Sequence, residues 1–245
     1  MRNHFLLWAA ILIASLCSFL PTHTAFANEE SDKHNLQGLE YFNAGNYQAA
    51  VTEFSEAIKI EPNNSTYHNN IGWSYYSWGV PYYTSAEENF KESIRLDVKH
   101  ESAYRGLAHL YHTQGKNDDA INNFIEAGKK YYNKENYTEA IIDFTDAINL
   151  GGGTAEIYNL RGLSHYNLEN PDYDAALNDF NKAVDCDKNF PFAFYNRANV
   201  YRIQDKKDDA ITNFMQAGKK HLFAKNYDEA RESFNLVLEL DPKNG

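Results

Sequence analysis

Two histidines and a run of glycines come nearest to the patterns of known chemical sites. His109 and His112 stand three residues apart, so both imidazoles would lie on one face of a helix, where they could share a metal ion. No third ligand stands at a matching position in the sequence, and polar lining of a groove is the favoured interpretation. The run Gly151-Gly152-Gly153 fits no phosphate-binding loop, and we expect it to end a helix and form a turn. We therefore predict neither a metal site nor a cofactor site.

Composition and charge narrow the classes of function further. The 245 residues include 34 Asp and Glu against 23 Lys and Arg, a formal net charge of -11 that would repel a polyanion, so nucleic-acid binding is not expected. The acidic residues fall where solvated helix faces are expected, which leaves no paired carboxylates for acid–base catalysis. Cys186 is expected to be a small buried apolar group. With no catalytic residues predicted, we expect a protein that is not an enzyme.

The first residues have the pattern of a cleavable secretory signal. An uncharged apolar run covers residues 5–20, and Ala-Phe-Ala at 25–27 supplies the small side chains that precede a cleavage site. The run is short for a helix that spans a bilayer, so removal of residues 1–27 is favoured over an uncleaved anchor. The mature chain would begin at Asn28, contain no later membrane span and reside in the bacterial periplasm or be secreted.

The rest of the chain repeats a pattern of small and aromatic residues. Apolar residues recur at i, i+3, i+4 and i+7, as in Ala50, Phe54, Ala57 and Ile58, and predict pairs of amphipathic helices. In each pair, a glycine leaves room where the two helices cross, an alanine keeps the opposing surface thin, and an aromatic residue four positions later fills the space beside the crossing. Such hairpins bury their apolar faces only by stacking on neighbours, so stability is roughly a sum over adjacent units.

This pattern resembles that of the tetratricopeptide repeat (TPR) family, whose unit is about 34 residues long. The matching structural positions are Gly38, Tyr41, Ala50, Phe54, Pro62, Gly72, Ala86, Phe90, Ala120, Phe124, Gly128, Ala140, Phe144, Gly162, Ala176, Phe180, Ala210, Phe214, Gly218, Ala230, Phe234 and Pro242. The resemblance covers nearly all of residues 31–244. It implies an all-α, right-handed superhelical solenoid of antiparallel helix hairpins, with about 12 helices in the mature chain.

A longer period of 90 residues lies over the repeat. Residues 118–150 and 208–240 share 16 identical residues of 33, and Pro81 and Pro171 mark the same two-residue insertion in both copies. We interpret this as an internal duplication. The predicted domains are module 1 at 28–120, module 2 at 121–210 and a C-terminal TPR unit at 211–245.

Two helices are predicted to belong to two hairpins each. Residues 118–134 read as one uninterrupted helix, which acts as a second helix through Ala120 and as the first helix of the next hairpin through Gly128. Residues 208–225 repeat this arrangement. We call them shared helices, and they explain how seven repeat registers fit into six hairpins.

The resemblance also implies a concave groove formed by the first helices. Carried over residue by residue, its positions hold mainly aromatic and amide side chains: Asn35, Leu39, Phe42, Asn69, Asn70, Trp73, Tyr76, Arg105, His109, His112, Asn159, Leu163, Tyr166, Tyr195, Asn199 and Arg202. Aromatic rings offer a large contact area with little rotamer entropy, and Asn side chains can hydrogen-bond the backbone of an extended peptide. The alternative for any single position is packing between adjacent first helices.

The predicted function is a non-catalytic scaffold or adaptor that binds an extended peptide segment of another protein. The alternative is a polysaccharide-binding component of an envelope export or assembly system, because aromatic rings and amides also suit sugar rings. The subtype that binds chaperone tails is not expected, since Asn70 alone matches among its clamp positions.

The last unit is predicted to make a contact of its own. Residues 241–245 close the sequence without a polar capping helix, and an uncapped unit exposes its apolar face. We therefore expect the surface around Phe223, Phe234 and Leu238 to dock on a partner or on a second copy.

Overall fold

The computed structural model describes residues 23–243, with side chains described from Glu29 onward. These residues form 12 α-helices and one 3-10 helix, and no strand occurs among them. The predicted all-α class and number of helices are confirmed for this part of the chain. The predicted signal segment lies outside the described residues as far as residue 22, and its predicted cleavage point falls within the first described helix.

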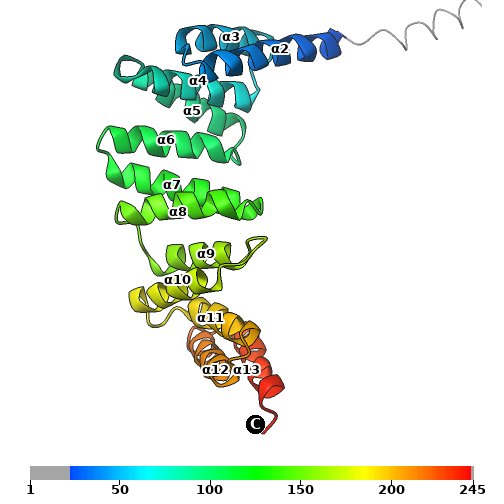
Figure 1. Cartoon of the computed structure of the whole chain (residues 1–245), viewed down its shortest axis with the longest axis vertical. Helices are drawn as coiled ribbons and strands as arrows, with labels where there is room; N and C mark the ends of the chain where they lie inside the picture. Colours follow the sequence, from blue (N-terminus) through cyan, green and yellow to red (C-terminus); the bar gives the residue numbers. More distant parts are fainter. Residues whose placement is uncertain (1–22, 244–245) are drawn as a thin grey trace, which may run out of the picture. The chain divides into compact units, whose positions relative to one another are not determined.

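The chain divides into two compact units, residues 1–100 and 101–245. The helices of unit 1 are α2 (His23–Asn43), α3 (Tyr47–Ile60), α4 (Ser65–Trp78), the 3-10 helix η1 (Val80–Tyr82) and α5 (Tyr83–Leu96). Those of unit 2 are α6 (Glu101–Thr113), α7 (Asn117–Asn133), α8 (Tyr137–Asn149), α9 (Ala155–Tyr166), α10 (Tyr173–Cys186), α11 (Pro191–Ile203), α12 (Lys207–Phe223) and α13 (Tyr227–Leu240) (Figure 1). The module boundaries at 120 and 210 follow the duplicated sequence rather than compactness, and they stay a prediction.

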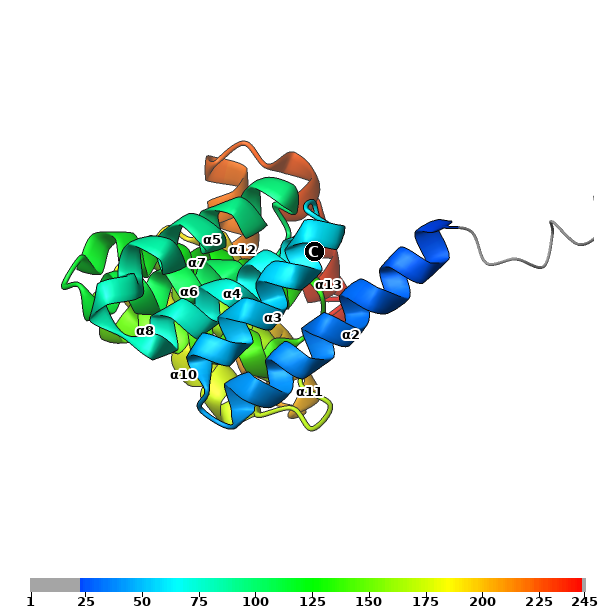
Figure 2. The ribbon, with the colours of Figure 1, turned by 90° about the horizontal axis from the view of Figure 1, so that it is seen from above.

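Unit 1 consists of two helix hairpins packed against each other. Helix α2 pairs with α3, α4 pairs with α5, and α3 packs on α4. Figure 2 shows α2 lying beside α3 and continuing beyond it, as expected from its 21 residues against 14. A Cβ atom on Gly38 would lie 2.6 Å from the Phe54 ring, and one on Gly72 would lie 2.8 Å from the Phe90 ring. Each phenylalanine thus packs directly on the glycine of its own hairpin.

Unit 2 contains the two shared helices, each 17 residues long. Helix α7 packs on both α6 and α8, and α12 packs on both α11 and α13. The first half of α7 buries Ala120 and Phe124, while Gly128 in its second half lies against the Phe144 ring of α8. The prediction of one uninterrupted helix in two hairpins is confirmed for both segments.

The glycine run forms a turn, as predicted. Helix α8 ends at Asn149, Gly151 has a φ of +101°, and the Thr154 hydroxyl accepts a hydrogen bond of 3.3 Å from the Ile157 N–H at the start of α9. A Cβ atom on Gly152 would lie 2.5 Å from the side chain of Ile121, so this position has no room for a side chain. The run therefore ends one helix and lets the next begin close to α7.

Candidate functional site

In unit 1, the predicted groove residues come together on α2 and α4. The Asn70 side-chain amide donates a hydrogen bond of 2.8 Å to the Asn35 side-chain oxygen, and both residues are half-buried. The Trp73 ring meets the Tyr76 ring edge to face, with 5.8 Å between centroids. Asn69, by contrast, is only 6% exposed and therefore belongs to the interior. The result is an amide pair beside two aromatic rings on one face of unit 1.

Two further groove residues of unit 1 serve mainly as packing. Leu39 and Phe42 of α2 are partly buried against the core cluster that contains Phe54 and Ile71. The Phe42 ring also meets the Tyr47 ring edge to face at 5.6 Å. Both side chains thus contribute to the core of unit 1, and the amide pair remains the polar part of this face.

In unit 2, the predicted residues on α9 are mostly engaged with neighbouring helices. Asn159 is 6% exposed and accepts a hydrogen bond of 2.8 Å from the Asn196 side chain of α11. The Tyr166 ring lies 5.8 Å from the Tyr173 ring of α10, and Leu163 is partly buried in the core cluster of these helices. These residues therefore pack α9 against α10 and α11, which is the alternative to lining a groove.

The residues on α11 are more accessible. The Tyr195 hydroxyl donates a hydrogen bond of 2.5 Å to the Glu232 carboxylate of α13, and its ring meets Phe214 edge to face. The exposed Arg202 guanidinium donates to the Asn199 side-chain oxygen at 3.0 Å. A polar surface therefore follows α11.

Arg105 forms a buried ion-pair cluster instead of an open surface. Its guanidinium donates two hydrogen bonds, of 2.7 and 2.8 Å, to the carboxylate of Asp143, and a third of 2.5 Å to Glu139. The guanidinium carbon lies 4.4 Å from the centroid of the Tyr131 ring. We call these four residues the Arg105 cluster. Because they lie on α6, α7 and α8, the cluster links both partners of a shared helix.

The electrostatics of the Arg105 cluster follow from its burial. Asp143 has no exposed side-chain surface, and burial raises its pKa to about 6, although the hydrogen bonds from Arg105 oppose this shift. Burial acts to lower the pKa of Arg105, but the hydrogen bonds to Asp143 and Glu139 and the charge of Asp143 together outweigh burial and raise that pKa. Both groups are therefore charged at neutral pH, and each neutralises the other inside the protein.

Two more arginines of unit 2, Arg161 and Arg197, each bridge two consecutive hairpins. Arg161 of α9 donates to both oxygens of Asp179 on α10, at 2.6 and 2.8 Å, and to the Thr145 hydroxyl of α8 at 3.0 Å. Arg197, 36 residues later, donates to Asn213 and Asn181 at 2.7 Å each. Neither arginine was among the predicted site residues.

The acidic residues do not all lie on solvated faces, so that prediction is wrong for two of them. Asp143 and Asp179 are 0% and 1% exposed, and each is paired with an arginine. In the sequence, the paired arginine stands 38 residues before Asp143 and 18 residues before Asp179, so no single spacing marks the two pairs. The predicted burial of Cys186 is also wrong, because it is a free and exposed cysteine at the end of α10.

The two histidines of α6 lie in different surroundings. The His109 ring meets the Phe124 ring edge to face at 5.0 Å, and burial lowers the pKa of His109. His112 is exposed, and its Nδ1 lies 3.4 Å from the Asn117 side-chain oxygen. Within residues 29–243, no three His, Cys, Asp or Glu side chains gather as metal ligands would.

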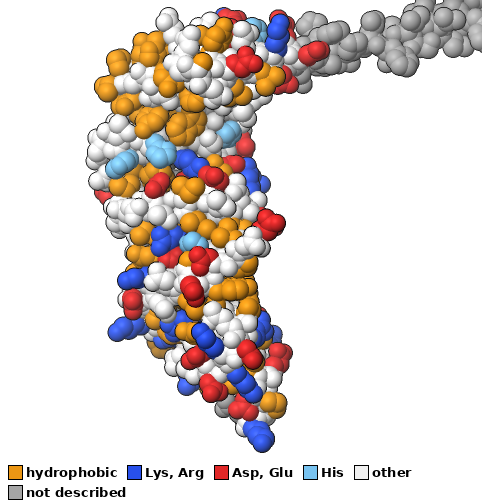
Figure 3. Space-filling view, in the orientation of Figure 1, with side chains coloured by type: hydrophobic (Ala, Val, Ile, Leu, Met, Phe, Trp, Pro, Cys, Tyr) orange, Lys and Arg blue, Asp and Glu red, His pale blue; other side chains and the backbone are white. Residues whose placement is uncertain are grey.

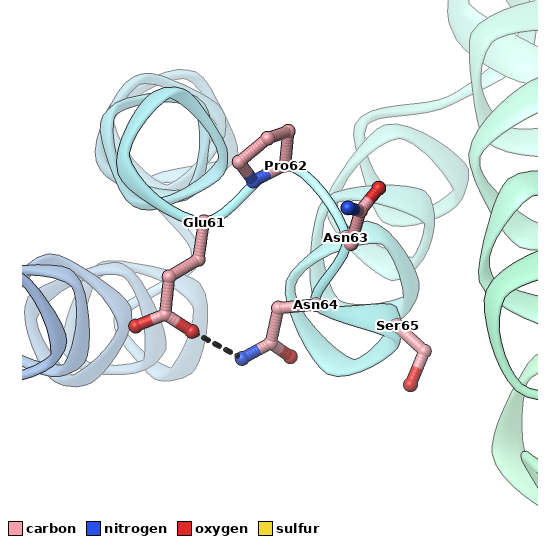
Figure 4. Close-up of a pocket in the computed structure, with 5 residues that line it drawn as sticks. All are labelled: Glu61, Pro62, Asn63, Asn64 and Ser65. Atoms are coloured by element: carbon pink, nitrogen blue, oxygen red, sulfur yellow. Dashed lines mark hydrogen bonds between the residues drawn. The ribbon is translucent and has the colours of Figure 1, made fainter. Parts of the chain in front are cut away.

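A pocket at the turn between α3 and α4 contains one titratable side chain. Its lining runs from Glu61 to Ser65 (Figure 4). The Glu61 carboxylate accepts hydrogen bonds from Asn64, at 3.2 Å, and from the buried Ser31 hydroxyl of α2. These contacts tie the turn to α2, and the pocket brings no nucleophile and base together.

None of the helices in residues 23–243 has both the length and the apolar character needed to cross a membrane. The same part of the chain is the part that matches known protein families. Residues 38–79 match a family model described as TPR repeat, and residues 180–212 and 221–244 match models described as tetratricopeptide repeat.

Curated relatives are similar over a part of their length. Small glutamine-rich tetratricopeptide repeat-containing protein 2 of Saccharomyces cerevisiae is 27% identical over 124 residues, which are 50% of this chain and 34% of the relative. Tetratricopeptide repeat protein 12 of Homo sapiens is 24% identical over 159 residues, which are 65% of this chain and 19% of the relative. The chain thus spans about a third or less of these relatives.

Two solved structures illustrate the similarity in fold. The TPR2AB domain of yeast Sti1 in a pHSP90 complex is 18% identical with a TM-score of 0.42, covering 87% of this chain and 99% of that one. The crystal structure of MamA is 20% identical with a TM-score of 0.40, covering 78% and 97%. The repeated hairpins, the phenylalanines packed on glycines and the three family-model matches together show that the chain belongs to the tetratricopeptide repeat family.

Proposed function

We propose that the protein is a non-catalytic scaffold that binds an extended peptide segment of another protein on the α2–α4 face of unit 1. The observation that carries this proposal is the hydrogen-bonded pair of Asn35 and Asn70 beside the rings of Trp73 and Tyr76. Amide side chains can exchange paired hydrogen bonds with an extended backbone, and the rings add apolar contact area.

The face of unit 1 fits this role better than the face of α6. The side chain of Arg105 is only 17% exposed, and its guanidinium donates hydrogen bonds to Asp143 and Glu139. The amide pair of unit 1 is half-buried and leaves the –NH2 group of Asn35 without a hydrogen-bond partner among the described residues. A ligand therefore meets an available donor on α2 and an occupied one on α6.

Capture by crosslinking tests the proposal. A photoreactive amino acid at Tyr76 is expected to crosslink a protein from native extracts, and Asn70→Ala should weaken that capture by roughly tenfold. Asn122→Ala, an exposed position on α7, is the matched control and should leave it unchanged. Capture that is indifferent to Asn70→Ala would overturn the proposal. Glycan binding that is lost in Trp73→Ala, with no protein captured, would favour the polysaccharide-binding alternative.

We further propose that the chain is exported and processed after Ala27, to the periplasm or outside the cell. The uncharged run at 5–20 supports export, and Ala-Phe-Ala at 25–27 supplies the small side chains that precede a cleavage site. N-terminal sequencing of the protein from its native source should begin at Asn28. An N-terminus at Met1 in the mature protein would contradict export by cleavage.

Self-association through the last hairpin is a third proposal, with a second copy as the partner. Phe223 is 87% exposed and Tyr227 is 64% exposed at the turn between α12 and α13, and Leu238 is 40% exposed on α13. Burial of such side chains would stabilise a dimer. Light scattering should show a concentration-dependent dimer that Phe223→Asp abolishes, and a strictly monomeric protein at high concentration would contradict it.

A further inference from the structure

Three aromatic rings are stacked where α4 turns into α5. The Trp78 and Tyr82 rings are 4.0 Å apart between centroids and within 18° of parallel, and Tyr75 lies within 6° of the Trp78 plane at 6.5 Å. Between them, Val80 is 74% exposed and Pro81 is exposed. We call these five residues the aromatic corner. Figure 3 shows hydrophobic side chains gathered at this end of α4 and α5, near the left edge of the view.

The fold does not require the rings of Trp78 and Tyr82, whereas Tyr75 also packs against the core cluster of unit 1. The duplicated turn between α9 and α10 has the same insertion and the same proline, Pro171, but the residues 90 positions after the three rings are His165, Leu168 and Asp172. Helices α9 and α10 nevertheless pack together as α4 and α5 do. The aromatic corner therefore contains aromatic side chains that the duplicate turn between α9 and α10 does not need in order to fold.

A neighbouring pair of tyrosines shows what a structural contact at this turn looks like. Tyr76 and Tyr83 have ring centroids 5.9 Å apart, and their counterparts Tyr166 and Tyr173 are 5.8 Å apart. This pair occurs in both copies, so Tyr76 contributes to the packing of its hairpin as well as to the α2–α4 face. The three-ring stack occurs in one copy, and because Tyr75 also packs against the core cluster of Phe54 and Ile71, Trp78 and Tyr82 are the rings that hairpin packing does not account for.

The segment that contains the aromatic corner carries no charge. Residues 69–86 contain no Asp, Glu, Lys or Arg, although 23% of the chain is charged and its net charge is -11. The duplicate segment, residues 159–176, contains Arg161, Glu169, Asp172 and Asp174. A ligand that complements the corner is therefore uncharged, since a charged one would lose its hydration without gaining an ion pair.

The polar groups of the aromatic corner further restrict the chemical class of the ligand. The Trp78 indole N–H is a donor only, and the phenol groups of Tyr75 and Tyr82 donate readily, while no carboxylate lies within the segment. Proline-rich segments match this chemistry because they lack N–H groups, present carbonyl acceptors and have flat apolar rings that pack on aromatic faces. They also hold an extended polyproline II conformation before binding, which lowers the entropy lost on binding. A neutral sugar brings hydroxyl donors as well as acceptors, and the donor-only indole N–H cannot accept from them, so a sugar fits the corner less well.

We propose that the aromatic corner binds an uncharged, proline-rich segment of a partner protein in the polyproline II conformation. This surface is distinct from the α2–α4 face, because Tyr75 follows Asn70 by five residues and therefore lies roughly 140° around α4 from it, and Tyr82 lies beyond the end of α4. The proposal therefore adds a second contact to the scaffold and does not depend on the first.

Fluorescence anisotropy on the full chain tests the proposal with a fluorescein-labelled oligoproline as the probe. Saturable binding is expected, while a glycine–serine peptide of the same length should not bind. The double variant Trp78→Leu/Tyr82→Asp takes the residue types of the duplicate turn, which that turn accommodates, and should weaken oligoproline binding by at least roughly tenfold. Circular dichroism and thermal unfolding would verify its fold, and Trp78→Leu alone would serve if the double variant were unstable.

Two matched variants make the outcome specific. The reciprocal change in the duplicate turn, His165→Tyr/Leu168→Trp/Asp172→Tyr, should add a second oligoproline site to the chain. Asn70→Ala should leave oligoproline binding unchanged, so failure of the peptide-binding proposal for the α2–α4 face and failure of this one are distinguishable. The proposal would be overturned by an absence of oligoproline binding, by binding that the double variant keeps, or by binding of a neutral glucose oligomer in place of oligoproline.

Discussion

Two segments of unit 2 have the same order of helices around a shared helix and different interactions across it. In α6–α8, the Arg105 cluster joins the two outer helices over the Tyr131 ring. In α11–α13, the positions 90 residues later hold Tyr195 and His221, and the link is the hydrogen bond from the Tyr195 hydroxyl to Glu232. The duplication has thus preserved the hairpins and replaced a buried ion pair by a single partly exposed hydrogen bond.

The two segments also differ in how completely their cores are covered. Phe144 of α8 is fully buried, and α9 packs on α8. Its counterpart Phe234 of α13 is only half-buried, although it packs on Gly218 as Phe144 packs on Gly128. The contact between the phenylalanine and the glycine of a hairpin thus depends on that hairpin's own small residues. Burial of the phenylalanine depends on the next helix that packs on the hairpin.

Removing the arginine of the first segment should have the largest effect. Arg105→Ala leaves the carboxylate of Asp143 buried and unpaired, and we expect a loss of about 3 to 5 kcal/mol in the free energy of unfolding. Urea denaturation measures this loss. Arg202→Ala, an exposed arginine in the second segment, is the control and should change stability by less than about 0.5 kcal/mol.

A compensating variant sharpens this test. In Arg105→Met/Asp143→Leu, two apolar side chains replace the buried ion pair, so most of the lost stability should return. If Arg105→Ala lost less than about 1 kcal/mol, the ion pair would not be what holds α6 to α8.

Replacing the contact alanine of each segment by a larger residue should have the second largest effect on stability. Ala140→Leu inserts methyl groups beside the fully buried Phe144, and we expect it to lose about 1 to 3 kcal/mol of stability. Ala230→Leu is the matched change beside the half-buried Phe234, where the ring can move toward solvent, and should lose less. Denaturant midpoints of the two variants would reveal the order, and equal losses would argue against the difference in coverage.

The hydroxyl of Tyr195 should contribute less. Tyr195→Phe removes the hydrogen bond to Glu232 but leaves the edge-to-face contact with Phe214, so we expect a loss of about 1 kcal/mol or less. Thermal unfolding can detect a change of this size. A loss as large as that of Arg105→Ala would mean that the two segments are held equally strongly.

The smallest expected effect is a pH dependence specific to the second segment. His221 is 2% exposed, and burial lowers its pKa below the usual value of 6.5, with Glu229 and Glu232 opposing the shift. The unfolded chain therefore takes up a proton that the folded chain does not, and stability falls as the pH drops below 6.5. His221→Tyr, which introduces the residue of the first segment, should reduce that fall.

Urea midpoints measured between about pH 7.5 and pH 5 would test this prediction. The other buried histidines, His109 and His165, are present in both proteins, so the difference between the two pH profiles isolates His221. Superimposable pH profiles would show that protonation of His221 does not affect the stability of the fold.

Much of the fold could be predicted because it depends on residues close together in the sequence. The glycine, alanine and phenylalanine of each hairpin lie within about one repeat, and helical periodicity alone places them on facing surfaces. The shared helices could be predicted for the same reason, since no proline interrupts the pattern between Asp118 and Lys134 and Gly128 fits the small contact position of the next hairpin. The candidate site was harder, because the same aromatic and amide residues suit a ligand and a neighbouring helix equally well.

The polar contacts inside the protein could not be predicted in this way. Arg105 and Asp143 are 38 residues apart, and their contact requires α6 and α8 to flank α7 at a distance that a guanidinium can span. Cys186 was expected to be buried from its place in the repeat, yet it lies at the end of α10 and is exposed. Burial at a helix end depends on what packs beyond it, which the repeat pattern does not contain.

The sequence by itself therefore determined the repeated hairpins, their small contact residues and the two shared helices, because helix periodicity and side-chain size act over a few turns. Only the tertiary structure decided which asparagines pair, which carboxylates are buried with arginines and which rings stack at the aromatic corner. Those outcomes depend on the distances between helices far apart in the chain, where one side chain either reaches a partner or stays in water.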